Sequence, residues 1–232
     1  MGQRSGVGVL DKAVCILESA APGASLAELV ERSGLPRATA HRLAQALEVH
    51  GLLSRDGDGR WHPGQRLGEF ASFAPDPLLR VAQSVLTLLR DSTGESAQLY
   101  RRRGDQRICV AASERSAGLR DTVPVGAALS ITAGSGAQVL LAWESPAEVL
   151  PLLPRARFSA RTLVEVRRRG WAQSVGEREP GVASVSAPVR DRLGRVVAAV
   201  CVSGPIDRLT RSPGRLHAAA VVGAARKLSD IA

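Results

Sequence analysis

Residues 25–61, SLAELVERSGLPRATAHRLAQALEVHGLLSRDGDGRW, predict two short helices, a tight turn between them and a small β-hairpin. Ser25 followed three residues later by Glu28 is a capping-box pattern, which begins a helix. Gly34 is typical of a helix end and Pro36 of the next helix start, because proline fixes φ near the helical value. The apolar residues of both helices recur at helical spacing: Leu26, Leu29 and Val30, then Ala40, Leu43 and Leu47.

The hairpin decides how this pattern is interpreted. Leu52–Arg55 and Arg60–His62 flank Gly57-Asp58-Gly59, which is a hairpin turn signal. Short helical hairpins occur in many proteins that do not contact DNA, but a helix-turn-helix followed by a two-stranded wing is typical of DNA-binding domains. The residues expected to contact DNA lie at the first helix start, on the exposed face of the second helix and in the wing: Ser25, Arg37, Ala38, Thr39, His41, Arg42, Gln45, Arg55 and Arg60.

The composition indicates an ordinary globular protein. With 232 residues, of which 44% are hydrophobic and only 3% aromatic, the chain can form one or two domains with aliphatic cores. No apolar run reaches the ~18 residues of a membrane span, and Asp11 and Lys12 interrupt any signal-peptide pattern. Cys15, Cys109 and Cys201 are far apart, which favours reduced thiols in a cytoplasmic protein over disulfides or a metal site. We expect no cofactor and no membrane partner.

The formal net charge of +9 does not by itself locate a DNA site. Residues 1–63 contain seven basic and seven acidic side chains, so the predicted DNA-binding region is neutral and the excess lies in residues 64–232. Arginines of the region would therefore have to act locally on DNA phosphates. The triplets Arg101–Arg103 and Arg167–Arg169 are better interpreted as solvated faces than as a second DNA site.

The remainder of the chain predicts a second domain of strands and helices. A connection from Gly64 to about Asp76-Pro77 precedes an amphipathic helix at Leu78–Ser92. We expect its apolar face (Leu79, Val85, Leu86 and Leu89), with the first helix, to form a dimer interface. Expected strands are Glu95–Arg102, Arg107–Glu114, Gly181–Val189 and Val196–Ser203, and expected helices are Thr132–Glu144, Ala147–Leu153, Thr162–Arg169 and Ser212–Ile231. A mixed sheet with helices on it is typical of ligand-sensing domains, and the fold class is α+β.

Two other function classes are open at this point. Ser135, within Gly134-Ser135-Gly136, could be the nucleophile of an enzyme, but the G-x-S-x-G pattern and a suitably placed histidine are lacking, as are other catalytic fingerprints. A redox switch could use one of the cysteines, but aliphatic neighbours raise thiol pKa values and reduce reactivity. We therefore expect a regulator and no catalytic residues.

Three segments of the chain resemble the IclR family of bacterial transcriptional regulators. They are GLPRATAHRLAQAL with the following GLLSRD and RWHPGQRLGEFA, then VPVGAALSITAGSGAQVLLAW, and then RRRGWAQSVGEREPGVASVSAPVRDRLGRVVAAVCVSGPIDRL. The last is the most specific, because its glycine, proline and apolar positions form a long ordered pattern. Within the family, GESAQLYRR, RICVAASE and GEREPGVASVSAPVR look most similar to the NdgR-type regulators, which are associated with amino-acid biosynthesis genes.

The resemblance implies a winged helix-turn-helix at residues 1–66, linker helices at 67–93 and a GAF-like effector-binding domain at 94–232. It implies a homodimer or dimer of dimers on palindromic double-stranded DNA, controlled by a small carboxylate such as an amino acid or an oxo-acid. Members that bind small oxo-acids tend to have Asp and Cys where this chain has Ser174 and Ser184. The implied pocket positions are Leu119, Asp121, Leu129, Gly134, Ser135, Ser174, Ser184, Cys201 and Ser203.

The pocket also has a basis in the residues themselves. Ala133–Ala137, AGSGA, is a small-residue helix start whose backbone N–H groups could bind a carboxylate. Ser174, Ser184 and Ser203 could then bind the remaining oxygens of the ligand. The alternative is that Gly134 and Gly136 only permit close packing of the helix on the sheet, and the two interpretations are compatible.

Overall fold

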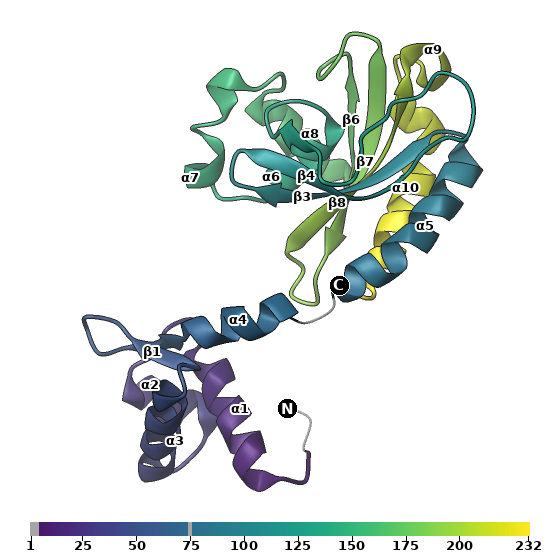
Figure 1. The fold of residues 1–232 in the computed structure, drawn as a ribbon. Coiled ribbons are helices and arrows are strands. Elements are labelled where there is room, and N and C mark those ends of the chain that lie inside the picture. The colour runs from purple at the N-terminus through teal and green to yellow at the C-terminus, as the bar shows by residue number, and fades with distance from the viewer. Residues whose placement is uncertain (1–4, 74–75) are drawn as a thin grey trace. The chain divides into compact units, whose positions relative to one another are not determined.

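The computed structural model describes residues 5–73 and 76–232, and the chain divides into two compact units, residues 1–75 and 76–232 (Figure 1). The first unit has the predicted winged helix-turn-helix order, and the α+β fold class is confirmed. Its elements are α1 (Gly8–Ala20), α2 (Leu26–Ser33), α3 (Arg37–Val49), β1 (Leu53–Arg55), β2 (Trp61–Pro63) and α4 (Gln65–Phe73).

Local sequence signals form the helix-turn-helix as expected. The Ser25 hydroxyl accepts a hydrogen bond from the Glu28 backbone N–H, and the Glu28 carboxylate accepts one from the Ser25 N–H, which completes a capping box. Gly34 ends α2 in the left-handed region at φ +66°. The three helices and the wing then enclose one aliphatic core around Trp61, formed by Ile16, Ala20, Ala24, Leu29, Ala40, Ala44, Leu47 and Leu53.

The segment after the wing, which the residue pattern indicated only as a connection, is helical from Gln65 to Phe73. Residues 65–73 form α4, although Gly68 lies within it. Glycine in an exposed helix destabilises it by only ~1 kcal/mol relative to alanine, so a single glycine does not prevent helix formation.

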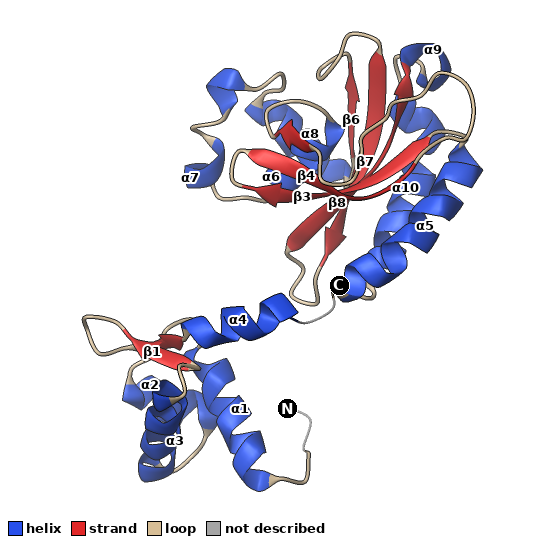
Figure 2. Cartoon of the chain, in the orientation of Figure 1, coloured by secondary structure: helices blue, strands red, loops and turns tan. Residues whose placement is uncertain are grey.

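The second unit is built on one six-stranded sheet with the order β5-β4-β3-β8-β7-β6 (Figure 2). Every neighbouring pair is antiparallel, so the expectation of a mixed sheet was wrong. The short edge strands β5 and β6 were not predicted, because three or four residues are too few to show alternation. The strands are β3 (Ser96–Arg103), β4 (Gln106–Ser113), β5 (Ala128–Ser130), β6 (Ala172–Val175), β7 (Val182–Arg190) and β8 (Val196–Pro205).

Helices cover both faces of this sheet (Figure 1). Along β8, Val200 and Val202 belong to the core under α5 and α10, whereas Cys201 belongs to the core under α6 and α8, because successive side chains of a strand point to opposite faces. The helices are α5 (Pro77–Thr93), α6 (Ser135–Ala142), α7 (Pro146–Val149), α8 (Ala160–Arg169), α9 (Ile206–Leu209) and α10 (Pro213–Ser229), with a 3-10 turn at Leu153–Arg155.

Helix α5 packs within its own unit, which corrects the predicted dimer interface. Leu86 and Leu89 are buried against the sheet and α10, and of the α5 residues in the expected interface only Leu79 is substantially exposed. The apolar periodicity identified the buried face correctly, but it could not show that the partner was the chain's own sheet.

Among the described residues, none of the helices is long and apolar enough to cross a membrane. No group of three or more His, Cys, Asp or Glu side chains lies in an arrangement that could hold a metal ion in that part of the chain.

Gly64 provides a test of how the wing joins α4. A Cβ atom at this position would collide with the backbone of Gly51 and Leu52, which has no flexible end that could move away. We therefore expect Gly64→Ala to lower the free energy of unfolding of the first unit by about 1–3 kcal/mol, as overpacking does. Gly57→Ala in the wing turn is the matched control, since its Cβ would meet open space. Denaturant unfolding measured by Trp61 fluorescence, with Trp143 and Trp171 replaced by Phe, checks this, and equal stabilities would contradict it.

Candidate functional site

Helix α3 separates its apolar and polar residues cleanly. Ala40, Ala44 and Leu47 are buried in the core of the first unit. On the outward face, Arg37, Ala38, Arg42 and Gln45 are exposed, and Thr39 and His41 are half-buried. The helix therefore presents the predicted polar set on one continuous surface.

The polar side chains of this surface make no contacts that would hold them in place. Within the described residues, Arg37, His41, Arg42 and Gln45 take part in none of the side-chain hydrogen bonds or ion pairs of the molecule. Their donors and acceptors are available to a partner, and the two arginines give the surface a local positive charge. This arrangement suits the edges of bases in a major groove.

The wing arginines, by contrast, are engaged with the rest of the unit. Arg55 stacks on the Trp61 ring, 3.9 Å from its centroid, and forms an ion pair with Glu48 at 3.3 Å. Arg60 forms an ion pair with Glu28 at 2.9 Å, next to the start of α2. The capping-box bonds from Ser25, together with Arg60, lower the pKa of Glu28 to about 2. Any phosphate contact from Arg60 would compete with this pairing.

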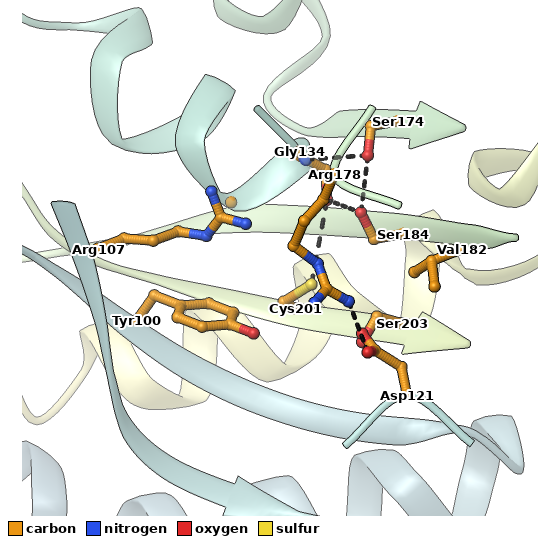
Figure 3. Close-up of a pocket in the computed structure, with 12 residues that line it drawn as sticks. Tyr100, Arg107, Asp121, Gly134, Ser174, Arg178, Val182, Ser184, Cys201 and Ser203 are labelled. Carbon is orange, nitrogen blue, oxygen red and sulfur yellow. Dashed lines mark hydrogen bonds and ion pairs between the residues drawn. The ribbon is translucent and has the colours of Figure 1, made fainter. Parts of the chain in front are cut away.

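In the second unit, a small cavity lies between the start of α6 and the sheet (Figure 3). Its volume is about 20 Å³, enough for one water molecule. Seven of the nine effector positions expected from the family resemblance line it: Asp121, Gly134, Ser135, Ser174, Ser184, Cys201 and Ser203. Leu119 and Leu129 do not line it, since Leu119 is 73% exposed in a loop and Leu129 lies in β5 opposite Arg107.

Three of the four serines that line the cavity are hydrogen-bonded to one another, whereas the Ser203 hydroxyl donates to Gln98. The Ser135 hydroxyl lies 2.7 Å from that of Ser184 and 2.8 Å from that of Ser186. Ser174 and Ser184 are 2.9 Å apart, and the Ser174 hydroxyl also accepts a bond from the Ser135 backbone N–H. These hydroxyls form a connected and buried floor, and a ligand would have to compete with bonds that already exist.

Glu177, which the sequence analysis did not identify, occupies the expected carboxylate seat at the start of α6. Its carboxylate accepts hydrogen bonds from the Gly134 backbone N–H and the Gln138 side-chain amide, both at 2.8 Å. Burial raises the pKa of Glu177, and these two bonds oppose the rise. The helix N-terminus therefore binds an internal carboxylate, so the expectation that its N–H groups are open to a ligand was wrong.

A buried cation that the sequence analysis also missed lies beside the serines. Arg107 is 4% exposed, and one of its terminal nitrogens, Nη1, donates to the backbone carbonyls of Ser130 and Ala133. Its Nε is buried without a hydrogen-bond partner among the described residues. Burial lowers the pKa of Arg107, and its guanidinium lies 5.3 Å from the centroid of the Tyr100 ring.

Arg178 is the second cation of the cavity and is paired. Its Nη2 lies 2.5 Å from the Asp121 carboxylate, which is almost completely buried. This pairing raises the pKa of Arg178 above its usual value against the opposing effect of burial. Figure 3 shows Arg178 reaching toward Asp121 over the cavity. Arg107 and Arg178 lie in sequences rich in arginine, so no local signal distinguished them from solvated cations.

The cysteines lie in environments that reduce their reactivity. Burial raises the pKa of Cys109 to about 11 and also raises the pKa of Cys201. A thiol is nucleophilic as its thiolate, so both are poor redox sensors in this conformation.

Comparisons with known proteins match both units. Residues 9–57 match the family described as "IclR helix-turn-helix domain", and residues 72–230 match "Bacterial transcriptional regulator IclR C-terminal". The HTH-type transcriptional regulator BhcR of Paracoccus denitrificans is 29% identical over 97% of this chain and 87% of its own length.

Solved structures of other proteins share the fold of this chain. A crystal structure of an IclR-family regulator from Rhodococcus sp. has a TM-score of 0.77 and 28% identity, covering 100% of this chain and 96% of its own. An IclR homolog from Microbacterium hydrocarbonoxydans, complexed with 4-hydroxybenzoate, shares the fold with a TM-score of 0.59 and 22% identity, covering 96% and 98%. The curated relatives of this chain, BhcR among them, are transcriptional regulators and not enzymes. This chain, matched over both of its units, belongs to the IclR family of transcriptional regulators.

Proposed function

We propose that α3 reads an operator sequence in the major groove of double-stranded DNA. The observation that carries this proposal is the exposed polar face of α3, whose side chains have no partners within the described residues. Arg37, Thr39, His41 and Gln45 contact base edges, with Ala38 against them, and Arg42 contacts a base or a phosphate. Ser25 at the start of α2, and Arg55 and Arg60 in the wing, contact the DNA backbone.

The protein acts as a homodimer or dimer of dimers on a palindromic operator in the cytoplasm. A two-fold symmetric pair of α3 helices matches a two-fold symmetric DNA site. The outer face of α1 supports an interface between copies, because Val7, Leu10 and Val14 are exposed there at helical spacing.

Residues 94–232 of the second unit form a GAF-like effector domain, and the linker helices lie within residues 67–93. The effector is a small carboxylate that binds in the cavity, with Asp121, Gly134, Ser135, Ser174, Ser184, Cys201 and Ser203 around it. The buried cation Arg107 supports an anionic ligand. The 4-hydroxybenzoate bound by the homolog from Microbacterium hydrocarbonoxydans is also a carboxylate.

The genes under control belong to amino-acid metabolism, as in the NdgR-type regulators, and the effector is an amino acid or an oxo-acid. The segments GESAQLYRR, RICVAASE and GEREPGVASVSAPVR support this assignment. The raised pKa values of Cys109 and Cys201 argue against the alternative in which a cysteine senses oxidants.

The DNA contact is tested by the double substitution Arg37→Ala, Gln45→Ala. We expect loss of operator affinity by about 1–3 kcal/mol for each base contact removed, together with weaker preference for operator over scrambled DNA. Gel shifts at fixed salt on operator fragments selected with the wild-type protein measure this. Arg168→Ala, which removes an exposed arginine of α8, is the control. Unchanged operator binding by the double variant would refute the assignment.

The effector site is tested on the protein–operator complex. We expect at least one member of a panel of amino acids, oxo-acids and 4-hydroxybenzoate to change operator affinity about tenfold, a coupling typical of allosteric regulators. Val182→Glu adds a negative charge at the half-buried cavity wall and should remove the response while leaving basal DNA binding intact. Val164→Glu, at an exposed position of α8, should respond like the wild type. A panel with no effect, or an unaltered response of Val182→Glu, counts against this cavity.

A further inference from the structure

The cavity is too small for a metabolite in the described conformation. Its volume of about 20 Å³ accommodates a water molecule but not a metabolite with several heavy atoms. Ser135, Ser174 and Ser184 are buried and bonded to one another, so they form a fixed floor. A ligand can therefore enter only if a side chain of the cavity wall moves.

Arg107 is the charged residue of the cavity lining that lacks an ion pair within the described residues, whereas Arg178 and Asp121 are paired with each other. No Asp or Glu lies within ion-pair distance of it among the described residues, and its Nε lacks a hydrogen-bond partner there. The carboxylates of Asp121 and Glu177 act on Arg107 only at longer range, because each is bonded to other partners. A ligand anion would give this buried cation a direct ion pair, which buried charges favour. The serines are neutral, so Arg107 is the group that selects the charge of a ligand.

The movable wall is the segment between β6 and β7. Arg178 of this segment is paired with Asp121 in the loop after β4, at 2.5 Å, so one ion pair joins two loops over the cavity. The preceding residue, Glu177, is bonded to the start of α6. Loop residues can change backbone conformation more easily than the strands that form the floor, so breaking the Arg178–Asp121 pair would open the cavity.

We propose that the Arg178–Asp121 ion pair is a latch that closes the cavity, and that Arg107 is the counterion for a negatively charged group of the ligand. Opening the latch exposes the serine floor and Cys201. The released Arg178 guanidinium then joins Arg107 around the anionic group. This inference rests on the proposed effector site and gives the roles of its two cations.

The reactivity of Cys201 measures opening of the latch even when the effector is unidentified, because Cys201 lines the cavity and is only 4% exposed. Alkylation by iodoacetamide, followed by peptide mass spectrometry, gives the modification rate of each cysteine. In Arg178→Gln we expect Cys201 to be modified about tenfold faster than in the wild type, because a largely buried ion pair has been removed. Asp121→Asn breaks the same pair from the other side and should have the same effect.

Two controls separate opening of the latch from general loosening. Arg168→Gln removes an exposed ion pair with Glu165 and should leave the Cys201 rate unchanged. Cys109 is fully buried outside the cavity lining, so its rate reports unfolding of the whole unit. A Cys201 rate that is unchanged in both latch variants, or that rises only together with the Cys109 rate, would overturn the latch.

The role of Arg107 is tested with iodoacetate, which carries a carboxylate where iodoacetamide carries a neutral amide. In the Arg178→Gln background, the ratio of the iodoacetate rate to the iodoacetamide rate should be about tenfold higher at Cys201 than at the half-buried Cys15. The raised pKa of Cys201 slows both reagents alike, so it cancels in this ratio.

Adding Arg107→Gln should bring the Cys201 ratio down to that of Cys15, whereas Arg107→Lys, which keeps the charge, should preserve most of it. Equal ratios at Cys201 and Cys15 with Arg107 intact, or a high ratio that persists in Arg107→Gln, would overturn the counterion role. Operator binding by the wild-type protein is measured separately. A protein that binds its operator but fails these tests remains a DNA-binding regulator without the latch.

Discussion

The first unit depends on Trp61, which joins the wing to the helices. Its backbone N–H and carbonyl are both bonded to Ala24 in the link between α1 and α2, at 2.7 and 2.9 Å, and its ring is 2% exposed in the core. Arg55 covers the ring from the other strand of the wing. The wing is thereby fixed to the same core that holds the apolar face of α3, and the polar face of α3 must point outward. Aromatic residues make up only 3% of the chain, and one of them, Trp61, forms this junction.

The second unit depends on a different constraint, which is that its buried charged side chains need partners. Glu177 lies on the start of α6, Asp121 is paired with Arg178, and Glu95 is paired with Arg208 at 2.5 Å. Each of these acidic groups has a specific partner, as buried charges require. Arg107 is the exception beside the cavity. The proposed anionic effector would give Arg107 a direct ion-pair partner.

The parts of the fold that sequence predicted are those specified by neighbouring residues. Ser25 with Glu28, Gly34 and the Gly57–Gly59 turn each specify a local geometry, and the structure contains all three features. The parts that were missed depend on distant residues. The spacing of Leu86 and Leu89 indicated an apolar helix face but not which part of the chain packs against it. The short strand β6 forms because it pairs with β7. Glu177 and Arg178 acquire their roles only because folding brings them to Gly134 and Asp121, respectively.

The proposed position of α3 in the major groove of the operator is tested most directly by cleavage of DNA from a tethered iron chelate. The chelate would be attached to a cysteine introduced at the exposed Ala38, in a Cys15→Ser background, since Cys109 and Cys201 are buried. We expect strand cleavage at two symmetric positions of the operator, with the strand offset of a major-groove reagent, and no cleavage from a chelate at Val164 on α8. Absence of cleavage from position 38 on DNA that the protein binds, or equal cleavage from position 164, would contradict it.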